Sequence, residues 1–202
     1  MSALLEQKTN QVLMTQDAFR VLMDCLARPG KINSLANPGF TPPQGLYSYS
    51  MLILITLLDG ETSFTVLPFN EPWIDYIQHN TGGRTSDALG AGYVLADGPI
   101  DIPDIEKVNR GDLLSPEKGA TLLFQVDKIE ESPRPSSTGI RLQGPGVNGV
   151  CDVYISGINP SHWLRLRQLN REFPLGADVF LIAVDGRVIG IPRSSILTWE
   201  VI

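Results

Sequence analysis

The feature that most constrains the fold of this chain is an unbroken apolar run near its C-terminus, from Val179 to Val184. The run does not alternate polar and apolar residues, which is typical of a strand covered on both faces. Asp185-Gly186 follows and predicts a two-residue hairpin, because glycine adopts positive φ without steric cost. A second strand is expected from Arg187 to Ile191, ending at Pro192, which has no backbone N–H to donate. The fold therefore has to bury one hairpin strand between two layers.

Helices and strands alternate along the rest of the chain. A first helix is expected with Thr15 as its N-cap and Pro29-Gly30 as its end. Further helices are predicted over residues 46–58, 70–82, 104–109 and 159–169, and strands over 62–67, 92–96, 121–126, 140–142 and 150–155. Residues 127–138 are charged and rich in Pro and Ser, which predicts a mobile loop. The pattern favours one α/β domain over residues 1–202, with a mixed sheet covered by helices and a loosely ordered segment at 1–14.

Composition excludes several classes of partner. The net charge of −6 argues against non-specific binding to nucleic acid or to anionic membranes, which requires the opposite sign. Cys25 and Cys151 are isolated, as expected in a reducing cytoplasm. Met1 to Lys8 lacks the apolar core of a signal peptide, and Met51 to Leu58 is far shorter than the ~20 residues of a membrane span. We therefore expect a soluble, cytoplasmic protein that binds neither nucleic acid nor membrane.

Two glycine patterns approach nucleotide-binding motifs and fall short of them. Gly90-Ala91-Gly92 lacks the third glycine of a dinucleotide fingerprint and leads into a strand-like segment. Gly144 and Gly149 have the spacing of a phosphate loop, but Val150-Cys151 stand where Lys and Ser or Thr would bind phosphate and magnesium. Neither motif predicts a nucleotide site.

Metal and pyridoxal phosphate sites are also not predicted. His79 and His162 are the only histidines, and neither has a second ligand at helical or hairpin spacing, so both are interpreted as surface or capping residues. A Gly-x-Ser-x-Gly elbow is missing, although a Ser-His-Asp arrangement stays open from sequence. No lysine follows a buried strand in a way that suggests a Schiff-base site among the five present, Lys8, Lys31, Lys107, Lys118 and Lys128.

The candidate site residues are those that suit an anion. Gly144-Pro145-Gly146, preceded by Arg141, could present backbone N–H groups, although a simple tight turn explains the same residues. Arg193 with Ser194-Ser195 could bind a phosphate-like group through a guanidinium fork and hydroxyls, although a surface arginine after a strand is an equal reading. Arg28 closes the first helix. We predict that Arg28, Arg193 and the glycine turn face one partly exposed surface that binds an anionic ligand or a partner.

Several separated stretches resemble the PhnH family, the H subunits of the bacterial carbon–phosphorus lyase system. Order and spacing agree from about residue 15 to 200, although one extra residue follows His79 relative to the usual His-Thr-Gly. The matching stretches are Phe19-Arg20 with Leu22-Met23, Arg28-Pro29-Gly30, Pro116 to Leu122, Leu142 to Val147, Phe173 to Asp178 and Ile191 to Ser194.

The resemblance implies a fold and a role. The fold would be a three-layer α/β domain similar to the large domain of pyridoxal-phosphate-dependent transferases, without that cofactor. The chain would form a homodimer and assemble with the G, I and J subunits of carbon–phosphorus lyase. It would be required when an alkylphosphonate and ATP form ribose 1-alkylphosphonate 5-triphosphate, as an accessory component beside the main catalyst, with a phosphonate or nucleotide as its potential ligand. A free-standing transferase-like enzyme with a small anionic substrate and a pure scaffold subunit are the alternatives.

Overall fold

A computed structural model describes the backbone of residues 2–202 and the side chains from Asn10 onward. Its helices are α1 (Ser2–Ala27), α2 (Ser48–Leu57), α3 (Glu71–Thr81) and α4 (Ser161–Leu169), with short 3-10 helices η1 (Pro103–Lys107) and η2 (Pro116–Lys118). Its strands are β1 (Asn33–Ser34), β2 (Ser63–Leu67), β3 (Arg84–Thr85), β4 (Tyr93–Asp97), β5 (Thr121–Val126), β6 (Lys128–Glu130), β7 (Thr138–Gln143), β8 (Cys151–Ser156), β9 (Asp178–Ala183), β10 (Arg187–Ile191) and β11 (Ile196–Val201).

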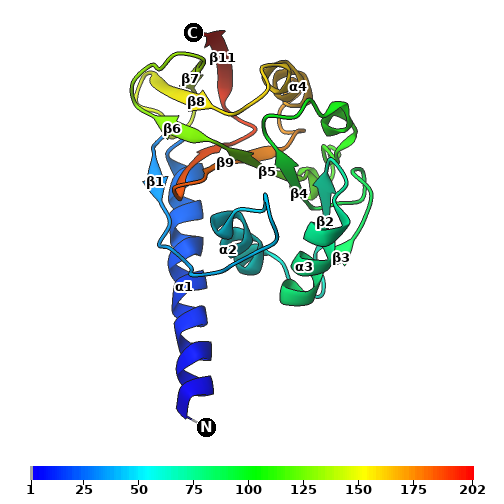
Figure 1. Ribbon diagram of the computed structural model, residues 1–202. Helices are drawn as coiled ribbons and strands as arrows, with labels where there is room; N and C mark the ends of the chain where they lie inside the picture. Colours follow the sequence, from blue (N-terminus) through cyan, green and yellow to red (C-terminus); the bar gives the residue numbers. More distant parts are fainter. Residues whose placement is uncertain (1) are drawn as a thin grey trace.

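The strands form two sheets (Figure 1). The larger has seven strands in the order β1-β10-β9-β5-β4-β2-β3, and β9 lies parallel to β5 and antiparallel to β10. The smaller has four antiparallel strands in the order β11-β7-β8-β6. The prediction of a mixed sheet in a single α/β domain is confirmed.

Both strands of the C-terminal hairpin form as predicted, and β9 lies next to β5, the middle strand of the larger sheet. Residues Val179 to Ala183 of β9 are all buried, because the strand has layers on both faces. The turn is one residue longer than predicted: Ile182 pairs with Val188, which leaves Val184 to Gly186 between the strands, and Gly186 closes this three-residue loop with φ +88°. The prediction was wrong at its edge, since Val184 lies beyond β9 and is exposed.

Three helices cover one face of the larger sheet. Apolar side chains of α1, α2 and α3 pack there against alternate residues of the strands, such as Phe64, Leu123 and Phe180. The middle of α2 is fully buried, in keeping with its almost continuously apolar sequence. In Figure 1 this helical layer lies below the sheet, and α1 projects beyond the rest of the chain at its N-terminal end.

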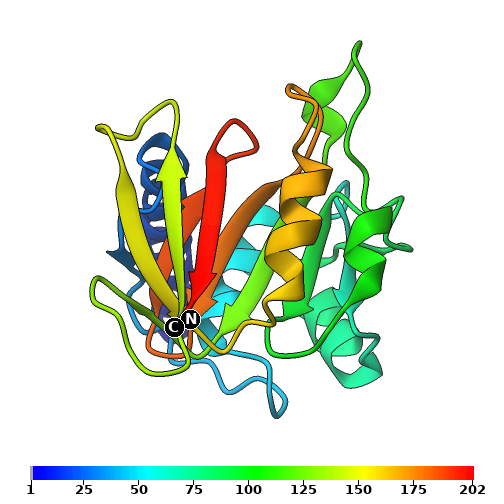
Figure 2. The ribbon, with the colours of Figure 1, turned by 90° about the horizontal axis from the view of Figure 1, so that it is seen from above.

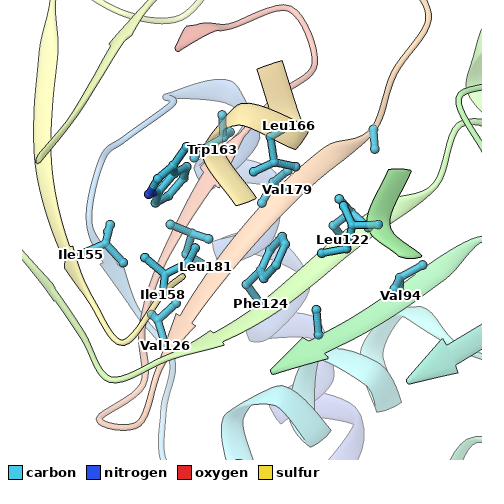
Figure 3. Packing of buried hydrophobic residues seen from close by; sticks show 14 of the residues in the cluster. Val94, Leu122, Phe124, Val126, Ile155, Ile158, Trp163, Leu166, Val179 and Leu181 are labelled. Atoms are coloured by element: carbon cyan, nitrogen blue, oxygen red, sulfur yellow. The ribbon is translucent and has the colours of Figure 1, made fainter. Parts of the chain in front are cut away.

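The opposite face is covered by the smaller sheet together with α4, so the expected cover of helices is replaced in part by strands (Figure 2). Trp163 and Leu166 of α4 pack onto Val179, Leu181 and neighbouring residues, as Figure 3 shows. Two strands of the smaller sheet were not predicted. β6 lies inside the segment expected to be a mobile loop, with Ile129 fully buried, and β11 is formed by the last residues of the chain.

The first helix also differs from the prediction. It begins at Ser2, so Thr15 lies in its interior, where its hydroxyl donates to the Gln11 and Val12 carbonyls instead of capping an N-terminus. The loose order expected for residues 1–14 stays a prediction. Along the described chain, no helix has both the length and the apolar character to cross a membrane.

Candidate functional site

Arg193, one of the predicted anion ligands, is occupied by the fold itself. Its side chain is only 13% exposed and pairs with Asp178 at the start of β9, with a nitrogen–oxygen distance of 2.8 Å. The guanidinium also donates to the Pro116 carbonyl at 2.7 Å, and the backbone N–H of Arg193 donates to Asp178 at 2.9 Å. The alternative of a surface arginine does not describe it, because the largely buried side chain joins the end of β10 to the beginning of β9.

The glycine turn does lie between two of the predicted segments. A side chain at Gly146 would collide with the Ala27 carbonyl and Pro29 at the end of α1, and one at Gly144 would press on the Ser194 carbonyl. Gly144 has φ +127° and Gly146 has φ +81°, and a residue with a side chain would be strained at either angle. The turn containing Pro145 therefore joins the first helix to the segment after β10.

The charged groups at this junction are already paired. Arg28 lies between Ala27 and Pro29, the two residues that contact the glycine turn. Its guanidinium hydrogen-bonds to Asp24, one helical turn earlier. Arg193 points towards Asp178, as described above. An anion- or partner-binding role for Arg28, Arg193 and Ser194 stays a prediction.

Arg141 belongs to a different surface. It lies on β7 opposite Asp152 of β8 and binds that carboxylate through two nitrogens, at 2.7 and 3.0 Å. These hydrogen bonds lower the pKa of Asp152 and raise that of Arg141. The pair lines a groove of about 240 Å³ on the smaller sheet, which also contains Tyr154 and Glu200. Arg141 is the one basic residue among the described lining residues, against the carboxylates of Asp152 and Glu200, so the groove does not favour an anion.

A cleft that was not predicted lies between α4 and the connection from β10 to β11. Its volume is about 220 Å³, and its nine lining residues divide into an apolar set and a polar set. The apolar set is Leu166, Val179, Ile191, Ile196 and Leu197, and the polar set is Arg167, Asn170, Arg171 and Ser195.

The two arginines of this cleft are distinct from the others in the chain. Nine of the eleven arginines pair with an Asp or Glu within 4.0 Å. Within the described chain, Arg167 and Arg171 have no such partner. The guanidinium carbon of Arg167 lies 4.9 Å from the centre of the Trp199 ring, a cation–π contact that orients it without neutralising it. The cleft therefore has two exposed positive charges and no compensating carboxylate among its described lining residues.

Two polar side chains of the cleft differ in their hydrogen bonding, since that of Asn170 is satisfied within the fold and that of Ser195 is not. Asn170 is committed to structure, since its side chain accepts from the Ala177 N–H at 2.8 Å and donates to the Ala177 carbonyl at 3.0 Å. The hydroxyl of Ser195 is buried and makes no hydrogen bond within the described structure. A buried hydroxyl without a partner costs free energy and calls for an explanation, such as a ligand or an ordered water.

The chemistry available in the cleft is binding and not proton transfer. Guanidinium groups stay protonated at any physiological pH, and a serine hydroxyl can donate one hydrogen bond. Among the nine described lining residues there is no carboxylate, histidine, lysine, cysteine or tyrosine. The arrangement suits recognition of an anionic group.

His162 stands at the other end of α4 and is a buried structural residue, which corrects its interpretation as a surface or capping histidine. Its Nε2 lies 2.8 Å from the Ile100 carbonyl, and its ring packs beside Phe124. Burial lowers the pKa of His162 below its ordinary value. His79, in contrast, lies exposed in the last turn of α3. No cluster of metal-binding side chains occurs among residues that the structure describes.

The carboxyl ends of the parallel strands, where α/β proteins usually bind ligands, are closed by the segment before α2. Gln125 near the end of β5 accepts from the Tyr47 N–H at 2.7 Å and donates to the Gly45 carbonyl at 2.9 Å. Burial, followed by the charge of Asp127, raises the pKa of Asp97 at the end of β4. The cleft beside α4 lies instead near the amino end of β9, so its position departs from the usual rule.

Comparison with known proteins identifies the class to which this fold and its surfaces belong. Residues 7–198 match the model of the bacterial phosphonate metabolism protein family PhnH, and the chain belongs to that family.

Two curated relatives align with nearly the whole chain. A protein of Stutzerimonas stutzeri named as a C-P lyase subunit, HtxG, is 33% identical over 181 residues, covering 89% of this chain and 84% of the relative. The alpha-D-ribose 1-methylphosphonate 5-triphosphate synthase subunit PhnH of Rhizobium meliloti (strain 1021) is 29% identical over 195 residues, covering 94% and 92%. The family suggested by the separated sequence stretches is thus confirmed.

Proposed function

We propose that this chain is the H-type subunit of a carbon–phosphorus lyase system and that it assembles with the G, I and J subunits. The step that it supports is the formation of ribose 1-alkylphosphonate 5-triphosphate from ATP and an alkylphosphonate, with release of adenine. The observation that carries this proposal is the family match over residues 7–198, together with two relatives that are named as subunits of such systems. Because ATP is a substrate and both cysteines are free thiols, we assign the complex to the cytoplasm.

Within that complex we assign the chain an accessory role. Displacing adenine requires proton donation to the base and recognition of a triphosphate, usually with magnesium. The cleft beside α4 offers Arg167, Arg171 and the Ser195 hydroxyl, which suit binding, and its described lining contains no group that donates a proton near neutral pH. A partner subunit would supply the acid, and this chain a binding surface.

Reconstitution tests the accessory role. Adenine release that depends on methylphosphonate is measured for the purified chain alone, for the G and I subunits alone, and for the mixture. We expect turnover only in the mixture. Turnover by this chain alone would establish a free-standing enzyme, and full turnover by the partners without it would remove the chain from this step.

We also propose that the isolated chain is a homodimer. A closed two-fold dimer is the commonest state of soluble homo-oligomers, and the family resemblance points the same way. Light scattering after size-exclusion chromatography gives the mass directly. A mass near 22.1 kDa, that of one chain, would contradict the proposal.

A further inference from the structure

We propose that the cleft between α4 and the β10–β11 connection binds a tetrahedral oxyanion that carries a small apolar substituent, the chemical class of the alkylphosphonates. Naming phosphonates rests on the proposed function, whereas the site itself rests on the geometry of this chain. Three features of the cleft support this assignment, namely its unpaired positive charge, its apolar wall and the Ser195 hydroxyl.

The positive charge of the cleft is available for a ligand. Arg167 and Arg171 are exposed, lie four residues apart and have no carboxylate partner within the described chain. The other nine arginines all have one. Guanidinium groups bind tetrahedral oxyanions through parallel N–H donors, and such charge-assisted bonds are about twice as strong as neutral ones. Contact with Trp199 holds the Arg167 guanidinium near the cleft without using its charge.

The apolar wall distinguishes the expected ligand from a bare phosphate. Leu166, Val179, Ile191 and Leu197 line the cleft and are between 0% and 8% exposed. An oxyanion at the arginines therefore has apolar carbon beside it, where a small alkyl group on phosphorus would lose contact with water. The volume of about 220 Å³ is below the ~300 to 1,000 Å³ of pockets that hold drug-sized ligands, so a complete nucleotide does not fit inside.

The Ser195 hydroxyl supplies an independent indication. Its oxygen is buried, has no hydrogen-bond partner in the described structure and belongs to a residue that lines the cleft. An oxyanion oxygen near the arginines would accept the hydrogen bond that this hydroxyl lacks. Ser195 follows the Arg193–Asp178 pair, so the segment carrying it is fixed in place before a ligand arrives.

A purely structural role for the two arginines explains less. Basic residues near the end of α4 would compensate the negative end of its dipole. That role requires neither the cleft nor a buried unpaired hydroxyl, and Arg171 lies beyond the last helical residue, Leu169. The ligand-binding assignment accounts for all three observations together.

The test measures binding of ethylphosphonate and of inorganic phosphate to the full chain by isothermal titration calorimetry at low salt. We expect saturable binding of ethylphosphonate, with weaker binding of phosphate. Arg167→Ala and Arg171→Ala should each weaken ethylphosphonate binding by about tenfold, because each removes charge-assisted hydrogen bonds. Ser195→Ala should weaken it by a smaller factor, because a neutral hydrogen bond contributes less.

Arg20→Ala is the matched control, since it removes the same charge from an exposed position on α1 and should leave binding unchanged. Near-ultraviolet circular dichroism of each variant verifies that it is folded. Equal affinity for phosphate and ethylphosphonate would overturn the part of the proposal that concerns the apolar wall and assign the cleft to free phosphate. Absence of binding, or binding that Arg167→Ala and Arg171→Ala leave intact, would overturn the site.

These outcomes are independent of the reconstitution described above. If the isolated chain binds no phosphonate but the mixture still needs this chain for turnover, the proposed site is wrong and the proposed function stands. If the chain binds ethylphosphonate at the arginines but the partners turn over without it, the site stands and the proposed function fails.

Discussion

The two ends of α4 are built from similar residues and serve opposite purposes. At the beginning of the helix every charged group is engaged. Arg165 hydrogen-bonds to Ser161, Asp101 and Glu106, and the His162 ring contacts the Ile100 carbonyl. At its end, Arg167 and Arg171 have no carboxylate partner within the described chain. The fully paired Arg165 and the unpaired Arg167 are only two positions apart in the sequence.

The difference shows how one short helix can be both anchored and available. Trp163 and Leu166 attach its inner face to the larger sheet (Figure 3), and the paired groups fix its beginning to η1 and the loop before it. The other end needs no ion pairs of its own, because Asn170 already ties it to Ala177 at the entrance of β9. Its cations are therefore free to face a ligand.

The largest expected effect comes from the residue that anchors the helix. Trp163 is fully buried, so Trp163→Ala leaves a cavity and should lower the free energy of unfolding by about 3 to 5 kcal/mol. Urea denaturation followed by far-ultraviolet circular dichroism measures the change. A loss below about 1 kcal/mol would mean that α4 is not anchored through its inner face.

The next effect distinguishes the paired arginine from the unpaired ones. Arg165→Ala removes hydrogen bonds from a side chain that is 13% exposed and should cost about 1 kcal/mol, since its partners are half exposed. The hydrogen bonds of Ser161 and Arg165 lower the pKa of Asp101, so this pKa should rise in the variant. Denaturation and a carboxyl titration by nuclear magnetic resonance measure both. An unchanged Asp101 pKa would contradict the pairing.

A third effect depends on pH and belongs to the anchored end. Because burial lowers the pKa of His162 below 6.5, the unfolded chain takes up this proton at a higher pH than the folded chain. The unfolded state therefore binds more protons as the pH falls below about 6.5, and His162 makes stability decrease in that direction. His162→Gln removes this titration, so the stability of the variant should depend less on pH between about 6.5 and 5. Denaturation midpoints at several pH values compare the two proteins, and equal slopes would contradict the assignment.

The smallest effect is expected at the available end. Arg167→Ala and Arg171→Ala should each change the free energy of unfolding by no more than about 0.5 kcal/mol, because both side chains are exposed without a carboxylate partner and the exposed Arg167–Trp199 contact contributes little. The same denaturation experiment measures this, with Arg165→Ala as the matched comparison two residues earlier. A loss as large as that of Arg165→Ala would make these arginines structural and remove the contrast between the two ends.

The sequence predicted the elements whose burial is periodic or complete. The apolar run of β9, the position of the turn that follows it and the face of α4 that carries Trp163 all follow from local residue patterns, whereas the length of the turn does not. β11 was missed because only Leu197 of its six residues is buried, so its pattern lacks the alternation of a strand. The start of α1 was misplaced because Thr15, a good N-cap by type, also tolerates a helix interior where its hydroxyl donates to earlier carbonyls.

The site was less predictable because pairing between distant residues decides it. The pairing of Arg193 with Asp178 at 2.8 Å was not predicted, because nothing near Arg193 in the sequence indicates that contact. Arg167 and Arg171 lie four residues apart after a buried tryptophan, which is also the pattern of an ordinary helix surface. The spacing of the two arginines was the one sequence feature that pointed to this site. It indicates a binding site only once Ser195 and the apolar residues are known to line the same cleft.

The contact between α1 and the C-terminal hairpin has a consequence for synthesis of the chain. The Gly30 N–H donates to the Gly190 carbonyl, Asn33 of β1 pairs with Val188, and a side chain at Gly190 would collide with the backbone of Cys25. The two partners are more than 150 residues apart in the sequence, so closing this loop is entropically costly and slow. On the ribosome, the first helix is made well before β9 and β10 and cannot pack on the hairpin until those strands have emerged. Until then its apolar residues, such as Leu22 and Cys25, have only earlier elements such as α2 to pack on, and the face that the hairpin later covers is open to a chaperone or to premature association with another nascent chain.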